Sequence, residues 1–224
     1  MTQSSHRRRF VTTIRSTEER WDVFRNADDL VDRYTSTLIE DLDRLRADPG
    51  LIDALELIWA KLSTGHDVYL AGNGGSASTA THIAADLSQA LTDCPETERC
   101  GRALPLTGSL AWMTAIANDV SYDRIFAQQL QQSARPGDAL VVLSVSGTST
   151  NVVEACRTAS ALNLEIVALL GSPGAVAEYA AIGVITKDPS FGRTEDIHLS
   201  IGHLMTTFVR GRHQVVHTTT GQGA

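Results

Sequence analysis

Short apolar runs that each lead into a glycine- or serine-rich segment constrain the fold of this chain most strongly. Such runs lie at 67–71, 139–143 and 165–170, and their length and composition are typical of buried strands. Helical patterns follow the first two runs over 76–91 and 149–162. Because strands that alternate with helices pair in parallel, the sequence predicts an α/β fold with a doubly wound parallel sheet.

Weaker patterns extend this alternation along the chain. We expect short strands over 102–106 and 183–186, and helices over 109–117, 124–132 and 174–181. The sequence has no internal repeat of solenoid period, so one alternating domain is the simplest organisation.

Amphipathic helices precede and follow this core. The segment 17–48 is rich in charge, its apolar residues recur at helical spacing, and a second helix is expected over 51–62. A last helix is expected over 194–210. Long helices ahead of an α/β core often pack between subunits, so we expect an oligomer. The predicted organisation is a disordered tail over 1–16, a single domain with N-terminal helices over 17–210, and a flexible tail over 211–224.

Composition excludes several classes of function. The chain has 224 residues, 42% of them hydrophobic, and a formal charge of -7, which argues against a nucleic-acid-binding module. No apolar run approaches the roughly 20 residues that span a bilayer, and no secretory signal is recognisable at the start. The cysteines Cys94, Cys100 and Cys156 lack a metal or redox spacing, so we expect free thiols in a cytoplasmic protein without membrane or nucleic-acid partners.

The first loop contains Asn73, Gly74, Gly75 and Ser76 between a strand and a helix. Glycine lets the backbone approach a ligand closely, Ser76 can cap the helix, and the free N–H groups of a helix start bind anions. A plain strand-to-helix turn accounts for the same residues, and this loop alone would leave that interpretation ahead.

The second loop carries a run of hydroxyl side chains between the strand at 139–143 and the next helix. Hydroxyls and backbone N–H groups can surround a phosphate without lysine or arginine. Neither loop has the pattern of a Walker A motif or of a dinucleotide-binding loop. Two such loops at the carboxyl edge of one parallel sheet predict a site for a phosphorylated small molecule. The hydroxyl-bearing residues are Ser144, Ser146, Thr148, Ser149 and Thr150.

A histidine and an acid lie four residues apart on the helix after the first loop. His82 and Asp86 therefore share one face, where imidazole and carboxylate can bind a divalent metal or act as an acid–base pair. Such a pair is more often solvated surface. The flanking apolar Ile83, Ala84 and Leu87 predict a largely buried helix, on which the pair would be costly without a role.

The last helix adds Glu195, His198 and His203. Together with His82 and Asp86 on the earlier helix, Glu195 and His203 would make four metal-type ligands. Spacing alone does not establish that these four residues bind one metal. Glu195 and His203 are separated by roughly 12 Å of helix rise. Glu195 must therefore lie at a frayed helix start, or the ligands must come partly from a neighbouring subunit. We interpret His198 as a surface or packing residue.

Taken in order, these motifs resemble the sugar isomerase (SIS) domain and, within it, the phosphoheptose isomerases. The resemblance covers about 51–210. It implies a five-stranded parallel sheet flanked by helices, a bound zinc ion, and a homotetramer with active sites at subunit interfaces. Its motifs are the loop at 72–76, His82 with the acid at 86, Ala117 to Asp119, the loop at 143–149, and Glu195 with His198 and His203.

The resemblance also implies roles for individual residues. Asp86 and His203 would move protons between C1 and C2 as a ketose phosphate becomes an aldose phosphate through an enediol. The substrate would be sedoheptulose 7-phosphate or a related heptulose or octulose phosphate. The zinc ligands would be His82, Asp86, Glu195 and His203. The substrate contacts would be Asn73, Gly74, Gly75, Ser76, Asn118, Asp119, Ser144, Ser146, Ser149 and Glu195.

Four positions depart from the pattern of this family. Asp86 stands where the family usually has Glu, and Glu195 where it usually has Gln, which makes the metal site more anionic. Val145 replaces the Thr between the loop serines, and Ala90 stands where an Arg is frequent. These changes bear on the sugar rather than on the fold.

A second class of function stays open at this point. A non-catalytic SIS protein could act through protein contacts, as a sugar-phosphate sensor or a replication-initiator-associated protein. Such proteins tend to lose the acid at position 86, so Asp86, together with His82 and His203, favours catalysis.

Overall fold

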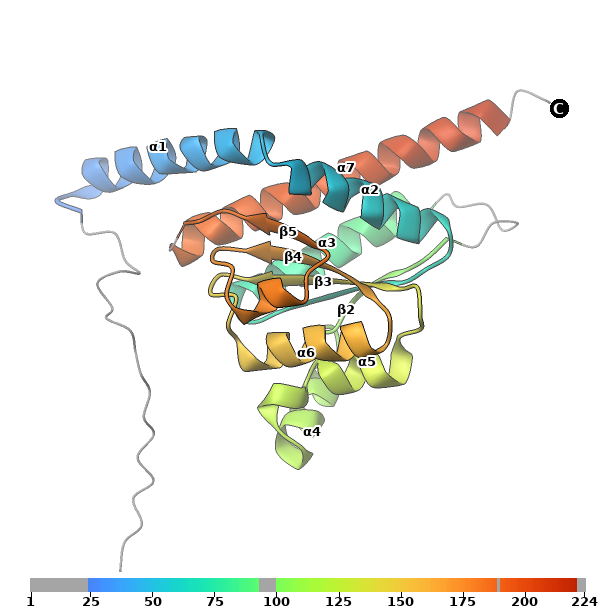
Figure 1. Cartoon of the computed structure of the whole chain (residues 1–224). Helices are drawn as coiled ribbons and strands as arrows, with labels where there is room; N and C mark the ends of the chain where they lie inside the picture. Colours follow the sequence, from blue (N-terminus) through green and yellow to red (C-terminus); the bar gives the residue numbers. More distant parts are fainter. Residues whose placement is uncertain (1–23, 93–99, 189, 221–224) are drawn as a thin grey trace, which may run out of the picture.

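Five parallel strands form the central sheet in the part of the chain that the structure, a computed structural model, describes: residues 24–92, 100–188 and 190–220 (Figure 1). Their order is β2-β1-β3-β4-β5, and every neighbouring pair is parallel. The doubly wound α/β sheet predicted from the sequence is therefore confirmed. The strands are β1 (Val68–Gly72), β2 (Ala103–Pro105), β3 (Ala139–Ser144), β4 (Glu165–Leu170) and β5 (Ile182–Ile185).

Helices cover both faces of this sheet (Figure 1). None of the described helices is long and apolar enough to cross a membrane. The α-helices are α1 (Ala27–Arg46), α2 (Pro49–Ser63), α3 (Gly75–Ala90), α4 (Leu110–Asp119), α5 (Ala127–Ser133), α6 (Thr150–Ala161) and α7 (Phe191–Thr220), and the 3-10 helices are η2 (Tyr122–Arg124) and η3 (Ala175–Glu178).

The side chains of β1 pack alternately against two layers of helices, one on each face of the sheet. Val68 and Leu70 pack in one hydrophobic cluster with residues of α2, α3 and α7, whereas Tyr69 and Ala71 pack in another with residues of α4, α5 and α6. Side chains of a strand point alternately to its two faces, so a fully apolar strand needs a helical layer on each side. The apolar runs of the sequence are buried for this reason.

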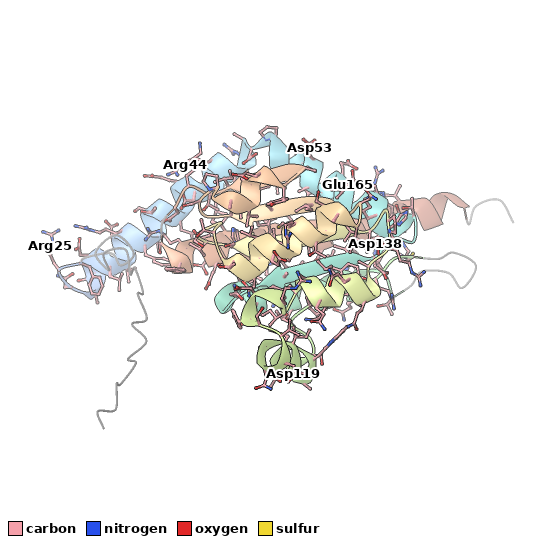
Figure 2. All side chains as sticks on the ribbon, turned by 60° about the horizontal axis from the view of Figure 1, so that its bottom comes forward. Arg25, Arg44, Asp53, Asp119, Asp138 and Glu165 are labelled. Atoms are coloured by element: carbon pink, nitrogen blue, oxygen red, sulfur yellow. The ribbon has the colours of Figure 1, made fainter. Side chains whose placement is uncertain are left out.

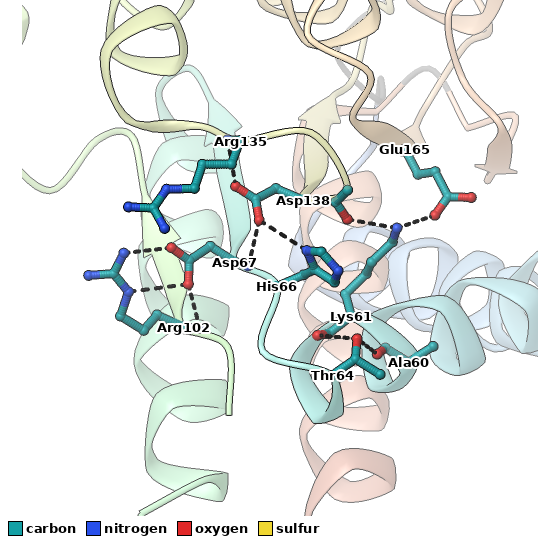
Figure 3. Close-up of polar contacts among 10 residues, drawn as sticks. Ala60, Lys61, Thr64, His66, Asp67, Arg102, Arg135, Asp138 and Glu165 are labelled. Atoms are coloured by element: carbon teal, nitrogen blue, oxygen red, sulfur yellow. Dashed lines mark hydrogen bonds and ion pairs between the residues drawn. The ribbon is translucent and has the colours of Figure 1, made fainter. Parts of the chain in front are cut away.

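The amino ends of β1, β2 and β3 are joined by a polar network, shown in Figure 3. The buried Asp138, just before β3, accepts hydrogen bonds from the backbone N–H groups of Asp67 at 2.9 Å and Arg135 at 2.8 Å. The Asp67 carboxylate in turn accepts from Arg102 Nε at 3.2 Å. Backbone groups that need partners are thus satisfied at this edge, and the carboxyl ends of the same strands lead into the two loops.

The last helix is longer than the sequence pattern predicted. We expected it to end at 210 and a flexible tail to begin at 211, but α7 continues to Thr220, so that boundary was wrong. Gly211 lies within the helix without breaking it. The Arg212 guanidinium lies 5.9 Å from the ring centroids of both Trp59 and Phe208, which are cation–π contacts. The expected tail at 1–16 lies outside the described residues.

Smaller differences concern other elements. The helix expected over 124–132 is divided into η2 and α5. Of the helix expected over 17–48, the described part begins at Ala27, where the Asn26 side chain accepts a hydrogen bond from the Asp29 N–H at 2.9 Å. Such an N-cap satisfies one of the free N–H groups of the first turn.

The cysteines differ from the expectation of three free thiols. Cys156 is free and buried, and burial raises the pKa of its thiol to about 12. Cys100 is disulfide-bonded, so the expectation was wrong for this residue. Cys94 lies outside the described residues.

A buried charge cluster attaches α1 to the domain. Asp41 of α1 and Asp188, which follows β5, are both buried. Arg193 Nε and Nη2 donate to the Asp188 carboxylate at 2.6 and 3.1 Å, and Arg44 Nη1 lies 2.9 Å from Asp41 Oδ1. Burial, followed by the hydrogen bond and charge of Asp188, raises the pKa of Asp41 to about 6. Burial opposes ionisation of Asp188 as well, but Arg193 and the Ser190 N–H outweigh it and lower the pKa of Asp188.

This arrangement predicts a pH-dependent effect of Asp41→Asn. The raised pKa means that folded Asp41 binds its proton more tightly than the unfolded chain does, so wild-type stability falls as pH rises from about 4 to 6. Asparagine resembles the protonated acid. We expect the variant to exceed wild type by about 1–3 kcal/mol in free energy of unfolding at pH 7.5 and to match it near pH 4.

Urea denaturation at both pH values measures this difference. Asp43→Asn, which changes an exposed acid on the same helix, is the control and should leave stability within about 0.5 kcal/mol of wild type. A loss of stability in Asp41→Asn at pH 7.5 would contradict the assignment of the raised pKa.

Candidate functional site

The first loop ends β1 and starts α3 without a side-chain cap. Gly74 is the N-cap residue and has a φ of 56°, a conformation that favours glycine, and no side chain bonds the first turn. Ser76 was expected as a possible cap, but it lies inside the helix and is buried. The start of α3 therefore keeps backbone N–H groups free of side-chain caps, and such groups can face an anion.

The second loop is held in shape by its own hydroxyls. The Gly147 N–H donates to Ser144 Oγ at 3.1 Å, and the Thr148 N–H donates to Ser146 Oγ at 3.3 Å. A Cβ on Gly147 would lie 2.4 Å from the Ser172 carbonyl oxygen, so the tight turn requires glycine. Ser149 is the N-cap residue of α6, yet its side chain makes no capping hydrogen bond.

The two loops meet in one pocket of about 340 Å³. They meet because β1 and β3 are neighbours, with Gly72 paired to Leu143. Six of the predicted substrate contacts line the pocket, and Phe191, at the start of α7, is a lining residue that sequence reasoning missed. The pocket is lined by Asn73, Ser76, Leu143, Ser144, Val145, Ser146, Ser149, Phe191 and Glu195.

Glu195 lies against the first loop rather than among the metal-type ligands. A Cβ built on Gly75 would be 2.2 Å from Glu195 Oε2, so glycine at this position leaves room for the carboxylate. Burial, and then the charge of Asp196, raises the pKa of Glu195. The side chain brings a carboxyl group to the same pocket as the loop hydroxyls.

A pair of amides joins the two loops. Asn151 Nδ2 donates to Asn73 Oδ1, and Asn73 Nδ2 donates to Asn151 Oδ1, both at 2.8 Å. Tyr122 Oη also donates to Asn73 Oδ1, at 3.1 Å. Sequence reasoning missed Asn151 and Tyr122. The available signal was a polar side chain in the first turn of the helix after the second loop.

Three of the four predicted metal ligands lie together. His82 Nε2 is 3.2 Å from Asp86 Oδ2 and 3.4 Å from His203 Nε2, and one ligand atom of each residue lies within 4.8 Å of the others. Ligand atoms at about 2.05 Å from a tetrahedral zinc are separated by about 3.3 Å. The donor types and these separations fit a divalent metal with an open coordination position. Among the residues that the structure describes, Glu195 does not belong to this group.

The group is more exposed than the sequence pattern predicted. The side chains of His82 and Asp86 are 49% and 32% exposed, although the neighbouring Ile83, Ala84 and Leu87 are buried as expected. The prediction that the pair is buried was wrong, because apolar neighbours occupy a different face of the helix. The pocket between the loops is not lined by these side chains.

Asn118 and Asp119 lie at the exposed end of α4, where Figure 2 places Asp119 at the edge of the molecule. Asn118 Nδ2 donates to Asp119 Oδ1 at 2.8 Å. Neither residue lines the pocket between the loops. The same segment reaches the first loop through Tyr122 instead.

His198 is fully buried. Burial lowers its pKa to about 4, so it is neutral at physiological pH. This position agrees with the interpretation of His198 as a packing residue.

Comparison with known proteins matches this geometry to a family. Residues 33–171 match the family model described as "SIS domain". The chain is 37% identical over 172 residues to the phosphoheptose isomerase of Mycobacterium tuberculosis (strain ATCC 25177 / H37Ra), covering 74% of this chain and 86% of that protein. It is 36% identical over 162 residues to the phosphoheptose isomerase of Thiobacillus denitrificans, covering 70% and 80%.

A solved structure agrees with these sequence relationships. Phosphoheptose isomerase from Neisseria gonorrhoeae superposes with a TM-score of 0.74 and 26% identity, covering 83% of this chain and all of that one (100%). The structural similarity thus extends over most of this chain and the full length of that protein. The chain belongs to the SIS domain family and, within it, to the phosphoheptose isomerases.

Proposed function

We propose that this protein is an isomerase that converts sedoheptulose 7-phosphate to D-glycero-D-manno-heptose 7-phosphate, or acts on a closely related heptulose or octulose phosphate. The observation that carries this proposal is a hydroxyl-rich pocket between the two loops, together with a separate His–Asp–His group on α3 and α7. Curated relatives with this activity in their names support it.

The pocket between the loops suits the phosphate. Ser144, Ser146 and Ser149 bring hydroxyls to it. The N-terminus of α3 adds backbone N–H groups and the positive end of the helix dipole, both of which attract an anion. No lysine or arginine lines it in the described structure, so neutral donors would hold the anion. This agrees with a protein of net negative charge.

The spacing of the two parts suits a long sugar. His82 lies six positions after Ser76 on α3, and His203 lies eight positions after Glu195 on α7. These offsets correspond to roughly 9 and 12 Å of helix rise. A phosphate at one end of a heptose lies several carbons from C1 and C2 at the other. A substrate extended along the α3–α7 pair could therefore place its carbonyl near His82, Asp86 and His203.

Asp86 and His203 are the groups that we assign to proton transfer. Isomerisation removes a proton from C1 and delivers one to C2, together with a proton shift between the two oxygens. The carboxylate of Asp86 suits the base, and an imidazole at His203 suits the acid. Positioned acid and base groups typically contribute 10²–10⁴-fold to a rate.

His82, Asp86 and His203 are also the residues that would hold a divalent metal, with zinc favoured by their donor types. When bound, the ion would polarise the sugar carbonyl. We keep Glu195 as a candidate fourth ligand, which requires its carboxylate to leave its place beside Gly75.

The exposure of this group supports a shared active site. A catalytic group that is 49% exposed at His82 needs a cover that excludes water. We propose a homotetramer in which a neighbouring subunit covers it, and in which Asn118 and Asp119 contact substrate across the interface. A non-catalytic SIS protein is the less favoured alternative, because the relatives above are named as enzymes.

Asp86→Asn and His203→Ala should each lower isomerase activity by about a thousandfold, because each removes a proton-transfer group. Proton NMR of purified protein with sedoheptulose 7-phosphate measures this, and a panel of other ketose phosphates defines the substrate. Both residues are partly exposed, so the thermal midpoint should stay within a few degrees. Asp53→Asn, an exposed acid on α2, is the control. Turnover like wild type in either site variant would rule out the assignment.

Ser146→Ala should weaken binding of the phosphorylated sugar by about tenfold, since a hydrogen bond to a charged group contributes about 1.5–3 kcal/mol. Calorimetric titration measures the affinity. Ser160→Ala changes an exposed serine on α6 and should leave affinity unchanged. Equal affinities for wild type and Ser146→Ala would count against the phosphate pocket.

Protein purified without chelator should contain about one divalent ion per chain, and His82→Ala should lose it, because His82 contacts both other members of the group. Elemental analysis by mass spectrometry gives the stoichiometry. A wild-type protein that is fully active and free of metal would refute the metal site.

A further inference from the structure

Asn151 is a buried amide that connects the two loops of the pocket. It lies in the first turn of α6, after the second loop, whereas its partner Asn73 belongs to the first loop. The residue is 1% exposed. We propose that Asn151 is a positioning residue, which orients the Asn73 amide so that an N–H of Asn73 faces the phosphate of the ligand. This inference rests on the proposed function for the identity of the ligand.

The hydrogen bonds of the Asn73 side chain leave it able to donate to a ligand but not to accept from one. Its Oδ1 accepts from Asn151 Nδ2 at 2.8 Å and from Tyr122 Oη at 3.1 Å, which uses both lone pairs. Its Nδ2 donates one N–H to Asn151 Oδ1 at 2.8 Å and has one N–H remaining. Because Asn73 lines the pocket, its side chain can act there only as a donor, and phosphate oxygens are acceptors.

The reciprocal pair also fixes which way the amide faces. If the Asn73 amide turned over, its N–H groups would face the Asn151 Nδ2 and the Tyr122 hydroxyl, and its oxygen would face Asn151 Oδ1. Each of the three bonds would then need its partner to rearrange. An amide free of Asn151 could present its oxygen to the pocket, which repels a phosphate. Asn151 therefore supplies orientation without touching the ligand.

Tyr122 supports the same orientation from another element. It belongs to η2, directly after the segment with Asn118 and Asp119, and its side chain is largely exposed. Its hydroxyl bonds only the oxygen end of the Asn73 amide. The loops after β1 and β3 and the segment after α4 thus meet at one side chain.

Asn151→Leu tests the proposal, because leucine has the same branched side-chain skeleton and no hydrogen-bonding group. Titration with inorganic phosphate and with sedoheptulose 7-phosphate should show Kd values about tenfold higher than wild type. KM for the sugar should rise by a similar factor, while kcat should change less than threefold, because the proton-transfer group lies elsewhere on α3 and α7.

Gln129→Leu is the matched control. Gln129 is also a buried amide, and its Nε2 donates to the Leu106 and Ile125 carbonyl oxygens at 2.8 and 2.7 Å. It lies on α5 and does not line the pocket. This variant should lose stability, as Asn151→Leu does, yet keep wild-type Kd and KM. Asn151→Leu with wild-type phosphate affinity and only a loss of stability would overturn the proposal.

A double variant tests whether Asn151 acts through Asn73. Asn73→Leu with Asn151→Leu should bind phosphate no more weakly than Asn73→Leu alone, because residues that act as a unit are not additive. Additive losses would contradict the mechanism. If Asn151→Leu does not fold, Asn151→Ser replaces it, since a short hydroxyl cannot reach both ends of the Asn73 amide.

The phosphate titration separates this proposal from the proposed function. Absence of sugar turnover in the wild type would count against the proposed function, while the titration with inorganic phosphate would still decide the role of Asn151.

Discussion

The parallel pairing of β1 with β3 is the constraint on which the rest of the site depends. These strands are distant in the chain, yet Gly72 pairs with Leu143, so the loops that follow them begin side by side. The strand order reverses direction between β1 and β3, and such points leave a crevice at the carboxyl edge of a sheet. The polar network around Asp138 fixes the opposite edge, which leaves the loops free to serve a ligand.

Two long helices extend this crevice into a site with two ends. α3 begins at the first loop and carries His82 and Asp86 further along, while α7 carries Glu195 near the loops and His203 further along. The pocket alone could hold any small phosphorylated molecule. A second group, His82, Asp86 and His203, lies further along both helices and has the chemistry of proton transfer and metal binding. The distance between this group and the pocket favours a long sugar phosphate as the substrate and an isomerase as the function.

The departures from the family pattern gain a physical meaning in this arrangement. Glu195 places a carboxyl group in the pocket where an amide is usual, so a bound phosphate faces one more acid unless the carboxyl is protonated or moves. Asp86 is one methylene shorter than the usual glutamate, yet its Oδ2 still reaches His82 Nε2 at 3.2 Å. In the site that we propose, hydrogen bonds from neutral groups, oriented in part by Asn151, would therefore carry phosphate recognition.

The sequence by itself determined the α/β class, the strands, the two loops and the spacing of His82 with Asp86, because these follow from local patterns of apolar, glycine and polar residues. It also indicated the family through the order of its motifs. The family resemblance implied that His203 joins His82 and Asp86, and the structure brings the three together. Tertiary structure alone decided that Glu195 lies beside Gly75 and that Asn151 bonds Asn73. These contacts join residues far apart in the chain. Periodicity fixes which face of a helix a residue occupies, but it cannot say what packs against that face or leaves it exposed.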